Sequence, residues 1–368
     1  MNSKQAIRCW LTAGAAAIAL VACGGGGDDE GYAPTALVTD VAGMQSPYAS
    51  SNTHVDPNLV NAWGLAFNPQ GFVWVANAGT STSTLYDGNG VPQSLVVAIP
   101  PNGAGGEAEP TGIVFNASTS FQVTQNGVTG TSIFIFAGEG GTISGWSPNV
   151  NATNAVLAVD RSAAGAIFKG LAHATQGGAD FIYATDFHNG VVAVFDANFA
   201  PVTLAAGAFT DPNLPAGFAP FGIQAIGNQL FVTFAKQDAN AEDDVAGDGL
   251  GALDVFDTAG VLVKRLIVPG GRLNAPWGMA MAPNDFGPFS NALLVANFGD
   301  GKINAFDPAT GNYLGTLSRP SGGVIAIDGL WGIAFGNGLN SQPTNTLFFT
   351  GGPSDESHGV YGRIDHHK

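Results

Sequence analysis

One short pattern recurs six times along the chain. In each copy an aromatic, basic or small residue precedes a glycine, an apolar strand follows, and a second strand ends in or beside a polar residue or glycine. The glycines are 48 to 58 residues apart, at Gly64, Gly112, Gly170, Gly222, Gly278 and Gly332. Within each copy the apolar residues follow a period of two, and a repeat of about 50 residues with about four short strands is typical of a propeller blade. The pattern predicts an all-β fold, a six-bladed β-propeller.

The two ends of the chain complete one blade. The sixth copy starts at Trp331 and runs out after its third strand, whereas TALVTDVAG at residues 35–43 has no blade of its own. We expect this N-terminal strand to complete the last blade, which closes the ring and removes its exposed edges. No linker interrupts the copies, so residues 35–368 are predicted to form a single domain. The expected blade core includes Val73, Val75, Phe134, Phe136, Phe231, Leu294 and Phe348, and outer strands are expected from Ser94, Val202, Val261 and Tyr313.

Residues 1–22 have the pattern of an export signal peptide. Lys4 and Arg8 form a basic leader, and an apolar stretch follows that is too short to span a membrane. The junction at residues 20–23, LVAC, resembles the bacterial lipobox, which implies a lipidated Cys23 followed by a flexible tether over residues 23–34. The alternative is an ordinary signal peptide with a chance cysteine. We therefore expect an exported lipoprotein of the bacterial cell envelope, anchored in the outer membrane through Cys23, with the membrane as one partner.

Composition excludes several classes of function. The chain has a formal net charge of −16, which opposes nucleic-acid binding because that binding needs clustered Lys and Arg. The 53 glycines follow no three-residue period, so collagen is excluded and many tight turns are expected. The sequence has no G-x-S-x-G elbow, H-E-x-x-H helix, Walker A loop or C-x-x-C pair. ATP, nicotinamide and thiol mechanisms are not expected.

Polar residues recur where the second strand of each copy ends. In a propeller these positions share one face with the residues before the repeat glycines, Trp63, Thr111, Lys169, Phe221, Trp277 and Trp331. The candidate ligands at this channel mouth are Asn77, Glu139, Asp186, His188 and Asn297. Together they could hold a divalent cation through oxygen ligands and polarise a carbonyl group. Alternatively, they bond within their own turns and the tryptophans pack between blades; His173 is expected to be a buried strand residue.

The insertion at residues 237–250 is the densest acidic segment. Alternating oxygen donors suggest a Ca²⁺ site formed by Asp238, Asn240, Glu242 and Asp244. The match to an EF-hand loop is poor, because Asp243 occupies the sixth position, where glycine is required. A solvated acidic loop is the alternative. The cofactor is therefore unknown, with Ca²⁺ as the candidate.

Long segments such as HVDPNLVNAWGLAFNP at residues 54–69 resemble a family of uncharacterised exported bacterial propeller proteins. More distantly, the pattern is similar to NHL-type propeller repeats. These resemblances imply a fold and leave the activity open, because NHL-like propellers include lactonases, lyases and protein-binding modules. The sequence favours a binding or scaffold module for a protein, glycan or small-molecule ligand, with a metal-dependent lactonase-like hydrolase or lyase as the alternative.

Overall fold

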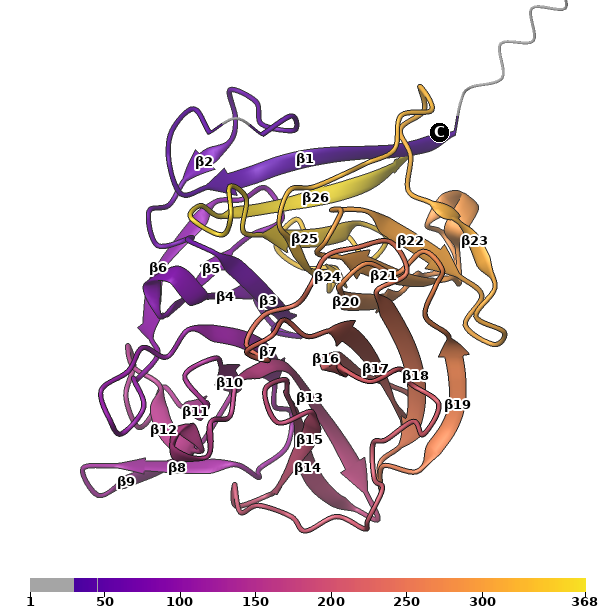
Figure 1. Ribbon diagram of the computed structural model, residues 1–368. Helices are drawn as coiled ribbons and strands as arrows, with labels where there is room; N and C mark the ends of the chain where they lie inside the picture. The colour runs from indigo at the N-terminus through magenta and orange to yellow at the C-terminus, as the bar shows by residue number, and fades with distance from the viewer. Residues whose placement is uncertain (1–29, 45) are drawn as a thin grey trace, which may run out of the picture.

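A computed structural model describes residues 30–44 and 46–368 (Figure 1). The predicted signal peptide and Cys23 lie outside these residues. In the described part of the chain, no helix has the length and apolar character needed to cross a membrane. The only helical segments described there are three short 3-10 turns, at Ala78–Thr80, Ser162–Ala164 and Gly287–Phe289. The rest of the regular structure is β, as the period of two predicts.

Six sheets stand around a central axis, and each is one blade (Figure 1). Blade one consists of β3 (Ala62–Phe67), β4 (Val73–Asn77), β5 (Thr82–Tyr86) and β6 (Pro92–Ala98). Blade two consists of β7 (Pro110–Phe115), β10 (Phe134–Gly138), β11 (Thr142–Trp146) and β12 (Val156–Asp160). Blade three consists of β13 (Phe168–Gln176), β14 (Ala179–Asp186) and β15 (Val191–Asp196). Blade four consists of β16 (Phe218–Ile226), β17 (Gln229–Lys236), β18 (Gly251–Asp257) and β19 (Leu262–Ile267). Blade five consists of β20 (Pro276–Met281), β21 (Leu293–Asn297), β22 (Ile303–Phe306) and β23 (Tyr313–Thr316). The six-bladed propeller is confirmed.

Blade six contains both ends of the described chain. Its inner strands are β24 (Leu330–Phe335), β25 (Leu347–Gly351) and β26 (Val360–His367), and β1 (Gly31–Thr39) pairs antiparallel with β26. The predicted closure by an N-terminal strand is confirmed, although β1 begins at Gly31 and so includes residues assigned to the tether. The short β2 (His54–Val55) pairs parallel with β1. Next to this seam, Asp40 accepts the Gly359 N–H at 3.1 Å and lies 2.7 Å from Nδ1 of His358.

The repeat glycines permit neighbouring blades to approach closely. A Cβ at Gly222 would overlap the carbonyl oxygen of Trp277 in the next blade, and a Cβ at Gly332 would lie 2.6 Å from the Trp63 carbonyl oxygen, across the junction of blades six and one. A side-chain hydroxyl fastens this junction, because Thr350 Oγ1 accepts the Gly332 N–H at 3.0 Å and donates to the Trp63 carbonyl. The recurring glycine therefore marks blade-to-blade contact rather than a turn.

Blade three differs from the expected pattern. The segment from Val202 was expected to be its outer strand, but the structure gives this blade three strands. Val202 N donates to the Val194 carbonyl at 2.8 Å, and then a turn closed by Ala208 N and the Ala205 carbonyl ends the pairing. Pro201 also lacks an N–H for a strand ladder. A separate hairpin, β8 (Gln122–Gln125) and β9 (Val128–Thr131), stands outside the six blades.

The expected core residues are buried between blades. Val73, Val75, Phe134, Leu294 and Phe348 have no exposed surface, and Phe136 and Phe231 are 1% and 6% exposed. They belong to clusters that join residues of adjacent sheets, which is how each blade covers the apolar face of its neighbour.

Candidate functional site

Aromatic side chains close one end of the axial channel. The rings of Trp63 and Trp331 stack with centroids 3.5 Å apart, and Phe298 stacks on the other side of Trp331 at 3.9 Å. Trp277 meets Trp63 edge-on at 5.6 Å, and Phe221 lies 5.9 Å from Trp331. Four of the residues before the repeat glycines thus pack against one another, in line with the packing alternative for the tryptophans, and they close the channel mouth that these positions were expected to surround. We call Trp63, Phe221, Trp277, Phe298 and Trp331 the aromatic plug.

A lysine is buried beside this plug. Lys169, from β13, is 2% exposed, and its ammonium pairs with the Glu139 carboxylate of the neighbouring blade. Asp243 Oδ1, from the acidic insertion, lies 3.5 Å from the same nitrogen. The ammonium also faces the Trp63 ring, with 5.3 Å between the nitrogen and the ring centroid. Burial is the largest single effect and favours the neutral amine, but the attraction of Glu139, together with that of Asp243 and Asp244, outweighs it and raises the pKa of Lys169 above its ordinary value.

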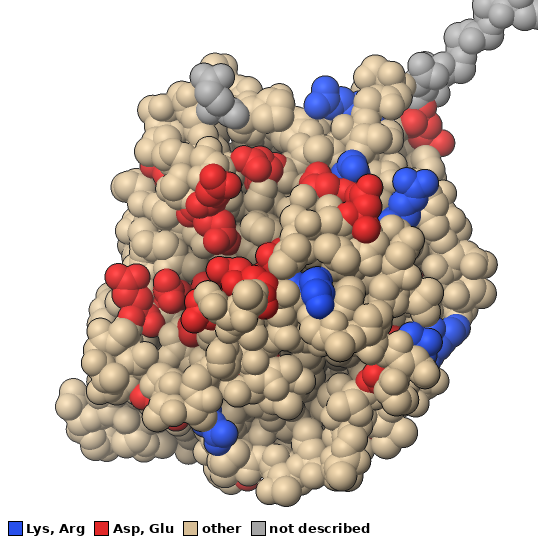
Figure 2. All heavy atoms as spheres, in the orientation of Figure 1, with Lys and Arg blue, Asp and Glu red and all other residues tan. Residues whose placement is uncertain are grey.

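More carboxylates surround Lys169 than its single charge can neutralise. Burial raises the pKa of Glu109, and repulsion from Glu139 adds to the rise. Burial raises the pKa of Asp244 to about 7, and Lys169 opposes this rise. Burial likewise raises the pKa of Glu356 to about 7, with Glu139 adding to it. We call Glu109, Glu139, Asp243, Asp244 and Glu356, together with Lys169, the axial acidic cluster. Figure 2 shows acidic side chains gathered around the centre of the face it presents.

Several buried polar atoms near the plug and the cluster have no partner among the described residues. Asn61 Oδ1, Asp244 Oδ2 and Glu356 Oε1 are acceptors without a donor, and the Nε1 atoms of Trp63, Trp277 and Trp331 are donors without an acceptor. Asn61 is 8% exposed, and its amide opposes the rise in the pKa of Glu356. Because an unsatisfied buried polar atom costs about 1 to 3 kcal/mol, these atoms favour a ligand that supplies hydrogen bonds.

The five candidate channel-mouth ligands have different roles. Asn77 Nδ2 donates to Thr82 and Thr84 at 3.1 and 3.0 Å, and Asn297 Nδ2 donates to the Arg272 carbonyl at 2.9 Å. The Oδ1 atoms of both asparagines are buried and have no partner among the described residues. Asp186 Oδ1 accepts the N–H groups of Ile167 and Asn189, both at 3.2 Å.

The remaining two lie closer to the charged site. Glu139 belongs to the axial acidic cluster. His188 lines an open hollow of about 270 Å³ together with Glu139 and Glu242. The structure thus holds Asp186 and the amide nitrogens of Asn77 and Asn297 in local hydrogen bonds, and it brings Glu139 and His188 to the acidic face.

The acidic insertion divides into an outward and an inward part. Asp238 Oδ1 accepts the N–H groups of Asn240 and Glu242 at 3.2 and 2.9 Å, so it caps the loop itself. Asp244 is partly buried, and the charge of Lys169 opposes the rise in its pKa, whereas Asp243 is 77% exposed and its Oδ1 approaches the Lys169 nitrogen at 3.5 Å. Among the described residues, no three His, Cys, Asp or Glu side chains are grouped to hold a metal ion. The four proposed Ca²⁺ ligands form no ready-made site, and Ca²⁺ binding by this loop stays a prediction.

Sequence reasoning missed Asn61, Glu109 and Glu356 as site residues. Asn61 and Glu109 stand two residues before Trp63 and Thr111, the positions that precede the repeat glycines. Both have positive φ, 49° and 44°, and Ala275 has φ 45° at the same place before Trp277. A left-handed backbone is unusual for residues other than glycine and occurs often at functional positions. This repeat position is the signal that identifies two of the three; Glu356 comes from the loop between β25 and β26 and matches no repeat.

Comparisons with known proteins agree with the fold. No protein-family model matches the chain. It is 35% identical to the uncharacterised protein R648 of Acanthamoeba polyphaga mimivirus, over 84% of this chain and 76% of that protein. It is 31% identical to the uncharacterised protein L690 of the same virus, over 84% of this chain and 81% of that protein. Among solved structures, a Bacteroides thetaiotaomicron protein of unknown function matches 91% of this chain and 76% of its own, with TM-score 0.55 and 9% identity.

Proposed function

The chain belongs to the family of the mimivirus proteins R648 and L690, and we propose that it is a ligand-binding β-propeller whose axial acidic cluster takes an organic cation. Neither relative carries an assigned activity, so the site must supply the argument. The observation that carries it is the excess of carboxylates, Glu109, Glu139, Asp243, Asp244 and Glu356, over the single Lys169 ammonium.

Electrostatics favour a positively charged ligand. Without it, burial in the first place and repulsion between carboxylates in the second favour the protonated forms of Asp244 and Glu356, whose pKa values are raised to about 7. A cation would allow both carboxyls to ionise and would satisfy acceptors such as Asn61 Oδ1. Binding should therefore release protons. The formal charge of −16 also draws cations toward the protein.

The spread of the carboxylates favours a ligand with more than one amino group. No three of them are grouped around a point where a single metal ion could bind within the described residues. A diamine or polyamine could instead place successive ammonium groups against separate carboxylates. The hydrolase or lyase alternative has less support, because no three His, Cys, Asp or Glu side chains of the described residues are grouped to hold its metal, although the buried Oδ1 atoms of Asn77 and Asn297 have no hydrogen-bond partner there.

Isothermal titration with spermidine tests this function. We expect one saturable site in about 150 mM salt, with a heat that changes with the ionisation enthalpy of the buffer because protons are released. Glu356→Gln, which removes one charge with little change of shape, should weaken binding by about tenfold. Asp285→Asn, at an exposed acid without a side-chain hydrogen bond among the described residues, is the matched control and should change nothing.

The same titration with CaCl₂ separates the two kinds of cation. Binding of Ca²⁺ without binding of spermidine would contradict the organic cation and favour the predicted Ca²⁺ site. Equal spermidine binding by the wild type and Glu356→Gln would show that the charge of the whole surface, rather than the cluster, attracts the ligand.

Membrane anchoring through Cys23 is a separate part of the proposal. It is supported by the LVAC junction and by the short stretch between Cys23 and the start of β1 at Gly31. The viral relatives lend no support to a bacterial envelope protein. Metabolic labelling with a palmitate analogue in a bacterial host should label the wild type and not Cys23→Ala; equal labelling of both would reject the anchor.

A further inference from the structure

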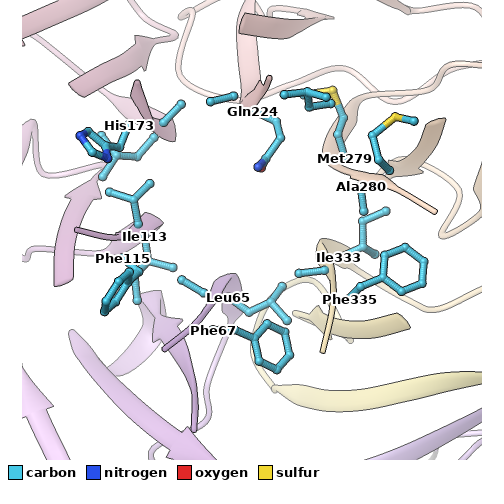
Figure 3. A pocket seen from close by; sticks show the side chains of 18 residues that line it. Leu65, Phe67, Ile113, Phe115, His173, Gln224, Met279, Ala280, Ile333 and Phe335 are labelled. Carbon is cyan, nitrogen blue, oxygen red and sulfur yellow. The ribbon is translucent and has the colours of Figure 1, made fainter. Parts of the chain in front are cut away.

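The axial channel opens on the side away from the aromatic plug. Here the inner strands of all six blades enclose a cavity of about 510 Å³. Figure 3 shows its side chains arranged as a ring around an open lumen. Apolar side chains dominate the lining, among them Leu65, Phe115, Met279, Met281, Ile333 and Phe335. No Asp, Glu, Lys or Arg of the described chain lines it.

This channel is closed at its inner end. A smaller cavity of about 50 Å³ shares Leu65, Ile113 and Ile333 with the larger one, and Trp277 is part of its lining. Beyond it lie the stacked rings of Trp63 and Trp331. A molecule can therefore enter from the open side only, and it cannot reach the axial acidic cluster without displacing the plug.

Two polar side chains stand on neighbouring blades of the lining. His173, on β13, lies at the wall, where Nε2 is 3.3 Å from Asp180 Oδ1 and the ring meets Phe121 edge-on at 5.6 Å. His173 was predicted to be a buried strand residue; it lies on a strand with Nε2 buried, and its side chain keeps 19% of its surface exposed. Gln224, on β16, is exposed, and Figure 3 shows its side chain reaching into the lumen.

Gln224 makes no side-chain hydrogen bond with the described residues, so its amide can serve a ligand. The inner strand of each blade pairs on one side only, which leaves backbone N–H and C=O groups along the lumen as further partners. The cavity volume falls within the range of about 300 to 1,000 Å³ typical of small-molecule sites. Its side chains are mostly apolar, and polar groups contribute much of the surface that faces the lumen.

We propose that this cavity is a second binding site, for an uncharged small molecule with an apolar body and one hydrogen-bonding group held by Gln224. The lack of charged side chains in the lining selects against ions, because a buried charge without a partner is costly. The two sites therefore take opposite kinds of ligand at the two ends of one axis. This inference does not depend on the proposed function, since it uses no residue of the acidic cluster.

Fluorescence titration with N-phenyl-1-naphthylamine, a neutral apolar probe with one N–H group, tests the site. We expect saturable one-to-one binding to the wild type. Gln224→Ala removes the amide and keeps the lumen open, so it should weaken binding by about two- to tenfold. Gln224→Trp fills the lumen and should abolish binding.

Gln122→Trp is the matched control, because Gln122 is exposed on the hairpin outside the blades and its substitution should leave binding unchanged. Circular dichroism and thermal unfolding should show that all variants fold. Equal binding by the wild type and Gln224→Trp, or a signal that does not saturate, would overturn the proposal. Glu356→Gln should bind the probe as the wild type does. The proposal for the channel and the proposal for the axial acidic cluster can therefore be rejected independently.

Discussion

The buried ammonium of Lys169 pairs with the carboxylate of Glu139, which belongs to the neighbouring blade. Lys169→Met should lower the free energy of unfolding at pH 7 by about 3 kcal/mol, because it leaves a partly buried carboxylate cluster without its counter-charge. Urea unfolding would measure the loss. Lys264→Met removes an exposed lysine from β19 and should have little effect. Equal losses in the two variants would show that Lys169 stabilises only through its alkyl chain.

The cluster should make stability depend on pH. The pKa values of Asp244 and Glu356 are raised to about 7, so between about pH 4 and pH 7 the folded protein keeps protons that the unfolded chain releases. The free energy of unfolding should therefore fall as the pH rises through this window and level off above it. Asp160 and Asp180 have lowered pKa values, so both stabilise the folded protein above about pH 4. Their contribution to the free energy of unfolding is lost as the pH falls below that value.

Asp244→Asn isolates this effect, because the amide resembles the protonated carboxyl and does not titrate. We expect urea unfolding to show that, between pH 5 and pH 8, the free energy of unfolding decreases less for the variant than for the wild type. The variant should be the more stable of the two at pH 8. An unchanged slope would mean that Asp244 titrates at its ordinary pKa.

The blade junctions should not tolerate a methyl group at Gly222. Its Cβ would overlap the Trp277 carbonyl oxygen, a backbone atom that cannot move aside without shifting the blade. Gly222→Ala should lower the free energy of unfolding by about 2 kcal/mol or more. Gly323→Ala is the control, since nothing lies within 4 Å of its added Cβ. Thermal unfolding would compare them, and similar midpoints would contradict close packing at the junction.

Removing β1 should leave the ring incomplete. A chain that starts at residue 40 exposes the edge of β26, and such an edge pairs readily with other chains. We expect light scattering to show oligomers or aggregates, whereas a chain that starts at residue 30 remains dispersed. A monodisperse, protease-resistant truncated chain would show that β1 is dispensable.

The repeat predicted most of the fold because each copy carries its own local signal. The glycine, the apolar strand and the polar strand end recur in every blade, and the unmatched strands at the two ends predicted the closure. The predicted outer strand of blade three was wrong. The segment from Val202 is apolar and therefore resembles a strand, but Pro201 and the turn at Ala205 prevent a regular ladder. Polarity patterns do not record that loss of backbone pairing.

The site was harder to predict than the fold. Glu139 was a candidate ligand and Lys169 was placed on the same face, but their contact depends on the rotation between neighbouring blades, which no local pattern specifies. Glu356 reaches the cluster from blade six only because the ring closes. The aromatic plug also depends on closure, since rings from several blades must converge before the channel end is filled.

The pairing of Gly31 with His367 determines the order in which this protein can assemble. No shorter stretch of the described chain contains both partners, so the ring cannot close until the residues of β26 have been synthesised. β1 stays unpaired while the blades between β1 and β26 form, and contacts so distant in sequence form slowly. During that interval the open edges of blade six are exposed to other chains. The yield of folded protein should therefore depend on the time before β1 pairs with β26 as well as on the stability of the closed ring.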